Sequence, residues 1–213
     1  VESDGYMYTG KQITFIPESK AYIVENGVQT NAGTYDVVVT LRQGYVWSDQ
    51  TAEPKKFTVE IKPLSVVKPT FPLNNVYTYD GSLYGANITD NDAYVMRGVP
   101  LAKEPGKYDL LISLAPNYVW SDTTLDTLMY SYIINRIKVD IPVQVDSVFD
   151  FTGAEQTYPI CDTLDYYIVS GHHRMSAGMH TVTVTLSDTS HYELSDSTVE
   201  PKLYKFVIGK RLV

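Results

Sequence analysis

The chain repeats itself three times, and this internal repeat constrains its fold more than any other feature. Six short sequence landmarks recur in the same order at a spacing of 71–74 residues. Fixed-period self-similarity indicates an array of homologous structural units. We therefore expect three domains in residues 1–64, 65–137 and 138–213, which we call repeats 1, 2 and 3. Each repeat has a glycine near its start and an isoleucine near its end: Gly10 and Ile61, Gly81 and Ile134, Gly153 and Ile208.

Two segments in each repeat alternate between apolar and polar residues with a period of two. This alternation predicts half-buried strands of an antiparallel sheet, with one face toward a core. In the longer central segments the expected inward residues are Tyr35, Val37, Val39 and Leu41, then Tyr108, Leu110, Ile112 and Leu114, then His180, Val182, Val184 and Leu186. In the closing segments they are Phe57, Val59 and Ile61, then Tyr130, Tyr132 and Ile134, then Tyr204, Phe206 and Ile208.

The composition and the turns favour an all-β fold. The chain holds 18 Tyr, and aromatic residues are enriched in strands. Short strand-like runs are separated by turn dipeptides such as Asn26-Gly27 and Asp80-Gly81, a pattern typical of β-sandwiches. We expect Trp47 and Trp120 to be core or edge anchors of repeats 1 and 2, with Leu194 in the same place in repeat 3.

The segments between repeats are short and contain no flexible Gly/Ser linker. Residues 61–66 and 134–139 run directly from one closing segment toward the next opening segment. Stacked repeats would then form an elongated rod on the order of 100 Å long. Residues 1–8 lack the opening segment of the other copies, and Leu212-Val213 resemble the start of a fourth repeat. We therefore expect this sequence to be a piece of a longer array.

Charge and cysteine content exclude several classes of protein. The 17 Lys and Arg residues against 25 Asp and Glu give a net charge of −8, which argues against a nucleic-acid partner. The sequence has no run of about 18 apolar residues, so we expect no membrane insertion, and its start shows no signal-peptide pattern. The single Cys161 excludes an intrachain disulfide framework.

All four histidines lie in repeat 3, but their positions favour structural roles over a metal site. His180 takes the inward place of Tyr35 and Tyr108, and His191 takes the turn place of Gly44 and Asn117. His172 and His173 are adjacent and would point to opposite faces of an extended segment. We expect no metal. If His180 were buried and neutral, repeat 3 would weaken below a pH of about 6.

Other polar groups indicate no catalytic residue and no cofactor. The recurring pairs Ser48-Asp49, Ser121-Asp122 and Ser195-Asp196 lack a histidine base in the first two repeats, so local backbone bonding explains them better. Asp90, Asp92, Asp122 and Asp126 do not form an EF-type loop, although calcium between domains stays open. The inward rows contain no Lys for an intramolecular amide cross-link. Exposed Tyr and Trp rings leave a carbohydrate site open.

The blocks that recur in the three repeats resemble a known group of tandem repeats. Tyr8-Thr9-Gly10, residues 31–35 (NAGTY), residues 44–49 (GYVWSD) and residues 54–61 (PKKFTVEI) are similar to the Ig-like MBG or YDG-type repeats of bacterial cell-surface and secreted proteins. Repeat 2 departs from this pattern at residues 104–106, and repeat 3 lacks the Trp.

The resemblance implies three small Ig-like β-sandwich domains in an extracellular bacterial protein. The expected function is that of a non-enzymatic, monomeric spacer or adhesive array whose partner is a host or cell-surface protein or a glycan. The alternative is a carbohydrate-binding module attached to a secreted enzyme. No ligand-binding residue is identified from the sequence.

Overall fold

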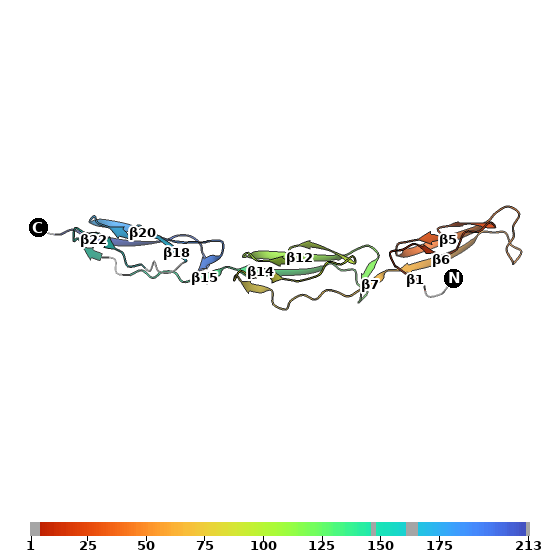
Figure 1. Ribbon diagram of the computed structural model, residues 1–213, viewed down its shortest axis with the longest axis horizontal. Coiled ribbons are helices and arrows are strands. Elements are labelled where there is room, and N and C mark those ends of the chain that lie inside the picture. The colour runs from red at the N-terminus through yellow and green to blue at the C-terminus, as the bar shows by residue number, and fades with distance from the viewer. Residues whose placement is uncertain (1–4, 146–147, 161–165, 212–213) are drawn as a thin grey trace. The chain divides into compact units, whose positions relative to one another are not determined.

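The computed structural model describes residues 5–145, 148–160 and 166–211. Every regular element in these ranges is a β-strand, and no helix occurs among them (Figure 1). The predicted all-β class is therefore confirmed. Cys161, Leu212 and Val213 lie outside the described residues.

The chain divides into two compact units. Unit 1 comprises residues 1–71, 88–98 and 110–130, and unit 2 comprises residues 72–87, 99–109 and 131–213. Repeat 1 lies in unit 1, repeat 3 lies in unit 2, and repeat 2 contributes residues to both. This division does not test the boundaries of the three expected domains, which stay a prediction.

Three four-stranded sheets share one strand order. In each sheet a short opening strand borders the closing strand, which borders the central strand, which borders a second edge strand. The first sheet contains β1 (Tyr6–Met7), β6 (Lys55–Lys62), β5 (Gly33–Leu41) and β3 (Tyr22–Glu25). The second contains β8 (Val76–Thr78), β14 (Leu128–Asn135), β12 (Gly106–Leu114) and β10 (Tyr94–Gly98). The third contains β16 (Val148–Asp150), β22 (Lys202–Gly209), β20 (Gly178–Leu186) and β18 (Tyr167–Ser170).

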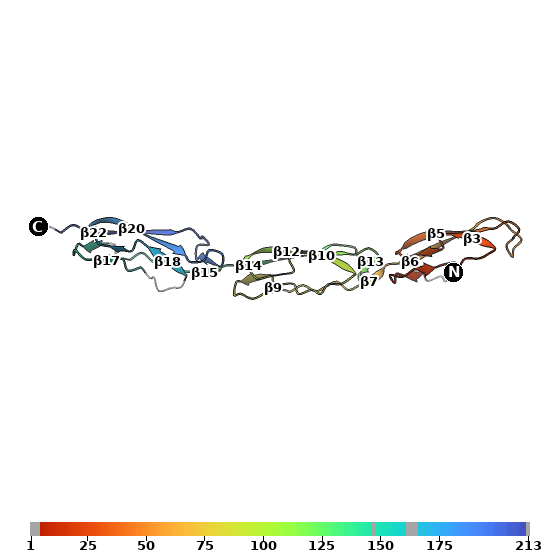
Figure 2. The same ribbon diagram turned by 45° about the horizontal axis from the view of Figure 1, so that its top comes forward.

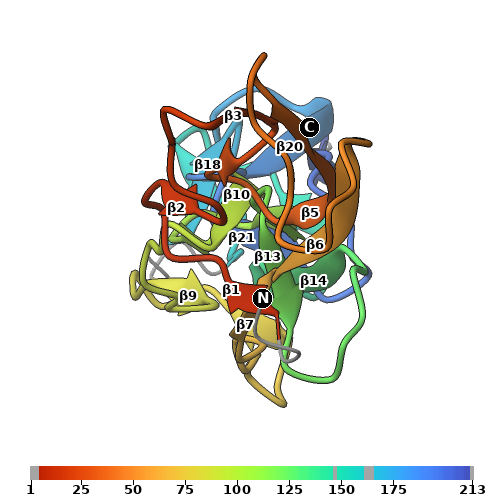
Figure 3. The ribbon, with the colours of Figure 1, turned by 90° about the vertical axis from the view of Figure 1, so that its right-hand side faces the viewer.

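The central strands pair as the sequence predicts. β5 runs antiparallel to β6 and to β3, and β20 runs antiparallel to β22 and to β18 (Figures 2 and 3). The opening strands behave differently, because β1, β8 and β16 each pair in parallel with the closing strand. Each sheet is therefore mixed, which the alternation of side chains did not indicate.

The described part of the chain also contains five two-stranded ladders. Three are antiparallel: β2 (Ile13–Thr14) with β4 (Val28–Gln29), β9 (Tyr84–Gly85) with β11 (Leu101–Ala102), and β17 (Gln156–Thr157) with β19 (His173–Arg174). Two are parallel: β7 (Leu64–Val66) with β13 (Tyr118–Trp120), and β15 (Ile137–Val139) with β21 (Tyr192–Leu194). In each parallel ladder, a strand at the start of a repeat pairs with a short strand that lies between the central and the closing strand of that repeat.

The expected inward rows form the cores, with one exception. In the central strands the middle residues are buried, namely Val37, Val39, Leu110, Ile112, Val182 and Val184. Phe57 lies on the expected inward face, opposite the buried Val37, but it is 37% exposed. Its counterpart Tyr130 is covered by the stacked ring of Phe71, at a centroid distance of 5.1 Å. The described residues contain no ring partner for Phe57, which leaves it open to solvent.

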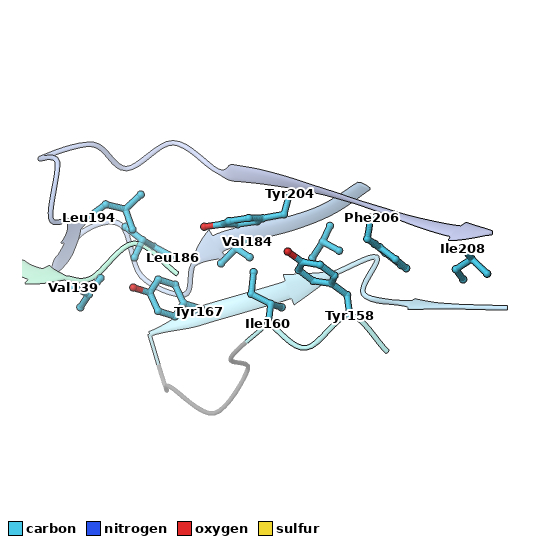
Figure 4. Packing of buried hydrophobic residues seen from close by; sticks show 11 residues of the cluster. Val139, Tyr158, Ile160, Tyr167, Val184, Leu186, Leu194, Tyr204, Phe206 and Ile208 are labelled. Carbon is cyan, nitrogen blue, oxygen red and sulfur yellow. The ribbon is translucent and has the colours of Figure 1, made fainter. Parts of the chain in front are cut away.

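The core of repeat 3 shows how few large side chains fill such a small fold (Figure 4). Phe206 is fully buried and lies between Tyr158 and Ile208 in Figure 4. The ring of Tyr158 stacks on it at 5.2 Å, and the ring of Phe149 meets it edge-on at 5.7 Å. The hydroxyl of Tyr204 donates a hydrogen bond to the carbonyl of Pro142, so this large ring keeps a polar partner while buried.

The anchor residues occupy one position in all three repeats. Trp120 is fully buried, and its indole Nε1 donates to the carbonyl oxygen of Asp126 at 2.7 Å. Trp47 makes the same bond to Glu53 at 2.8 Å but is only half-buried. Leu194 is buried at 3% exposure, as expected of the residue that replaces the indole.

Candidate functional site

The recurring Ser-Asp pairs build turns. Asp122 accepts hydrogen bonds from the backbone and hydroxyl of Thr124 and from Lys68 Nζ at 2.6 Å. The hydrogen bond from Lys68, followed by those from Thr124, lowers the pKa of Asp122 to about 2. Equivalent clusters are formed by Asp49, Thr51 and Lys55 and by Asp196, Thr198 and Lys202. Each carboxylate therefore holds its own loop beside a lysine, in agreement with the structural interpretation of these pairs.

His180 lies where the sequence placed it, but it is only half-buried. Its Nε2 lies 2.7 Å from the carbonyl oxygen of Ser176, four residues earlier. The hydroxyls of Tyr35 and Tyr108 donate to the carbonyls of Asn31 and Glu104, also four residues earlier and both at 2.8 Å. The condition of full burial is not met, so the expected acid weakening through His180 has no basis in this structure.

His172 and His173 contact each other and a neighbouring hydroxyl. The rings of His172 and His173 lie against each other at 3.9 Å, so the expectation that they point to opposite faces is wrong. His173 Nδ1 lies 2.9 Å from the hydroxyl of Thr157. Within the described residues, no group of three or more His, Cys, Asp or Glu side chains is arranged to hold a metal ion.

The four aspartates considered for calcium are not brought together. Asp90 and Asp92 line an open groove of about 870 Å³ in unit 1, together with Tyr94 and Tyr118. Asp122 and Asp126 are not part of its lining, and the carboxylate of Asp122 is bound by Lys68. The groove combines two aromatic rings with acidic groups, and we call it the acidic groove.

The strongest contacts between repeats lie at two places, which we call junction 1 and junction 2. Junction 1, within unit 1, joins repeat 1 to the turn before β13. The Asn117 side chain accepts a hydrogen bond from the backbone of Ala32 at 2.8 Å and donates one to Asn31 Oδ1 at 3.2 Å. Tyr118 meets the ring of Tyr8 edge-on at 5.6 Å. Asn117 has a φ of 73°, a left-handed conformation that asparagine tolerates well.

Junction 2, within unit 2, joins the turn before β21 to two loops of repeat 2. The ring of His191 stacks on Tyr79 at 4.1 Å with an interplanar angle of 13°. Its Nε2 lies 2.6 Å from Glu104 Oε2, and its Nδ1 lies 2.5 Å from Asp188 Oδ2. Arg136 Nε donates to the carbonyl of Ser190 at 3.2 Å beside this turn.

The two junctions use equivalent positions of the repeat. His191 corresponds to Asn117, Glu104 to Asn31, and Tyr79 to Tyr8. The backbone agrees, because Leu64 N donates to the carbonyl of Asn117 at 2.9 Å and Ile137 N donates to that of His191 at 2.8 Å. His191 lies in the turn that the alignment of the repeats predicts, but its contact with Glu104 was not predicted. The available signal was that an acid and a base, Glu104 and His191, stand at the positions of the two asparagines of junction 1.

The charge state of junction 2 follows from its hydrogen bonds. The pKa of His191 is raised, mainly by the hydrogen bond with Glu104 and then by that with Asp188. The pKa of Asp188 is lowered, mainly by its bond with His191. Both shifts favour an imidazolium ion between two carboxylates.

Comparison with known proteins adds no assignment. No protein-family model matches the chain, and no curated protein matches it significantly. Among the described residues, no helix is long and apolar enough to cross a membrane.

Proposed function

We propose that the chain is an array of three small Ig-like β-sandwich domains that serves as a non-enzymatic spacer or adhesive stalk. The observation that carries this proposal is the recurrence of one junction at equivalent positions, in junction 1 and again in junction 2. An array needs the end of each domain to fit the start of the next. The extracellular bacterial setting follows from the sequence resemblance alone.

The fold is consistent with a mechanical role. Three sheets share one strand order, and large rings and aliphatic residues form one small core in repeat 1 and another in repeat 3. The charged clusters with shifted pKa values hold turns or junctions in place. At Asp122 and Asp196, the contacts with lysine and threonine side chains are sufficient to explain the shift. None of these clusters needs a substrate to explain it.

Pulling the whole chain between its ends tests this proposal. Three independent domains of about 70 residues should give three separate unfolding events, each releasing roughly 24 nm of chain at about 3.4 Å per residue. Small-angle scattering of the same protein should give a maximum dimension near ~100 Å. A single cooperative event, or a compact particle, would contradict the array.

Carbohydrate binding is the second candidate function, and the acidic groove is the observation that favours it. Aromatic faces beside carboxylates suit the apolar and hydroxyl surfaces of a sugar ring. A glycan array with the whole chain tests this candidate, with Asp90→Asn combined with Asp92→Asn as the groove variant. Tyr45→Ala is the control, because Tyr45 is 49% exposed and outside the groove. Binding that survives the groove variant would exclude this site.

A further inference from the structure

Junction 2 differs from junction 1 in one chemical respect, because its central contact can gain or lose a proton. Asn31 and Asn117 in junction 1 are neutral at every pH at which the protein folds. Glu104 and His191 in junction 2 are both ionisable, and His191 has a side-chain exposure of 25%. Equivalent positions therefore hold a hydrogen bond between neutral groups in junction 1 and a hydrogen bond between ionisable groups in junction 2.

The geometry makes the contact with Glu104 the part that depends on the proton. An imidazolium ion has two N–H donors, which here face Asp188 on Nδ1 and Glu104 on Nε2. A neutral ring keeps only one donor. Asp188 lies three residues away in the same turn, and it is fixed there by the backbone of Ser190 at 2.8 Å. The remaining proton therefore stays with Asp188, and Glu104 then faces a lone pair.

We propose that His191 and Glu104 form a protonation-dependent clamp that fastens the turn before β21 to repeat 2 in mildly acidic medium and releases it as the pH rises. The clamp deepens the proposed spacer function, since it would make one joint of the array stiff or loose according to pH. Its test rests on the contact alone, so it can fail or succeed independently of that function.

The pH range of the clamp follows from the two pKa shifts. A histidine with a raised folded pKa contributes stability in full below its unfolded value of about 6.5, and this stability is lost as the pH rises through the folded pKa. An aspartate with a lowered folded pKa contributes stability above its unfolded value of about 3.9, which is lost as the pH falls. The clamp is therefore strongest between roughly pH 4 and 6.5.

Other groups around His191 modify this range without changing its direction. Tyr79 covers one face of the ring. Arg136 lies beside the turn through its bond to Ser190 and disfavours the imidazolium ion. Lys138 and Glu193, on β15 and β21, lie 3.9 Å apart as an ion pair, so their charges largely compensate. The two carboxylates in direct contact with the ring determine the sign.

Residual dipolar couplings of the isotope-labelled whole chain at pH 5.5 and pH 8 test the clamp. They report whether the strands of repeats 2 and 3 share one degree of order, while a histidine titration of the same sample reports the charge of His191. We expect the order of repeat 3 relative to repeat 2 to be lost at pH 8 and kept at pH 5.5. The order of repeat 1 relative to repeat 2, across the neutral junction 1, should not change.

Two variants serve as matched controls. Glu104→Ala, which removes the partner of Nε2, should lower the pKa of His191 and leave the junction loose at both pH values. Glu104→Asn with His191→Asn introduces the asparagine pair of junction 1, without the bond from Ala32 because the equivalent Pro105 has no N–H. It should remove the pH dependence while β20 and β22 keep their wild-type amide shifts. A relative order that is the same at both pH values in the wild type, although His191 titrates, would overturn the proposal. So would a pH dependence that persists in the double variant.

Discussion

Repeat 3 has a leucine, Leu194, where repeat 2 has Trp120. Among single exchanges that give repeat 2 the equivalent residue of repeat 3, Trp120→Leu should be the most destabilising. Trp120 is fully buried, and its ring lies 6.1 Å from that of Tyr94. Leu194 occupies the same position in repeat 3 at 3% exposure, so the neighbouring residues there pack against the smaller side chain. The neighbours of Trp120 pack against the larger indole, so the exchange leaves a cavity there.

The magnitude follows from the area and the hydrogen bond that are lost. A buried Trp removes about 200 Å² from water, worth ~5 kcal/mol at about 25 cal/mol per Å². Leucine restores about 2–3 kcal/mol of this. The Nε1 bond to Asp126 is also lost, at a cost near 1 kcal/mol, because Asp126 is exposed and its carbonyl can bind water. We expect a loss of about 3 kcal/mol from a domain whose total is ~4–11 kcal/mol.

Hydrogen exchange of the whole chain, read by mass spectrometry segment by segment, measures this loss. Amides in residues 106–135 should exchange with a lower opening free energy, while residues 178–209 stay unchanged. Trp47→Leu is the matched control, since Trp47 is only half-buried and the expected loss is about 1 kcal/mol. Equal losses at the two tryptophans, or a loss below about 0.5 kcal/mol at Trp120, would refute the reasoning from burial.

Three further predictions concern the turns and the edges of the cores. The folded pKa of Asp122 and of Asp196 is about 2, below the unfolded value of about 3.9, so both carboxylates should stabilise the fold above pH ~4 and lose this effect toward pH 2. The denaturation midpoint of the variant with Asp122→Asn and Asp196→Asn should therefore depend less on pH in that range. Gly85→Ala should cost about 2 kcal/mol more than Gly178→Ala in chemical denaturation. Both glycines have a strongly positive φ, but an added Cβ would lie 2.2 Å from the carbonyl oxygen of Pro100 only at Gly85. Phe57→Ser should cost under about 1 kcal/mol and Tyr130→Ser about 3 kcal/mol, and equal thermal shifts would contradict their different burial.

The sequence was sufficient for features that depend on the alternation of side chains. Alternation fixes which side of a strand faces the core, so Val37, Leu110 and Val182 lie buried as predicted. The slot shared by Tyr35, Tyr108 and His180 was also identified, because the three repeats supply an internal alignment. Each of these side chains reaches the carbonyl oxygen four residues earlier, so this position favours a ring that carries a polar atom at its edge.

Features that depend on which segments meet in space could not be predicted. Alternation carries no information on strand direction, so the parallel pairing of β8 with β14 was missed. The exposure of Phe57 depends on a covering ring that Phe71 supplies to Tyr130, and a single strand does not reveal its cover. The contact of His191 with Glu104 joins residues 87 positions apart. Only the three-dimensional arrangement of the turns brings them together.

The two junctions together suggest how an array of similar repeats can vary its joints without changing its fold. The backbone bonds at Leu64 and Ile137 are the same in both junctions, so they set the approach of the chain independently of the side chains. The central pair of side chains differs, asparagine with asparagine or glutamate with histidine, and each pair is in direct contact. A change at either position alone would leave an unmatched polar group against its partner, which is costly where water is partly excluded. Paired change at these two positions is therefore the route by which the repeat can alter the response of a joint to pH while the cores on both sides stay as they are.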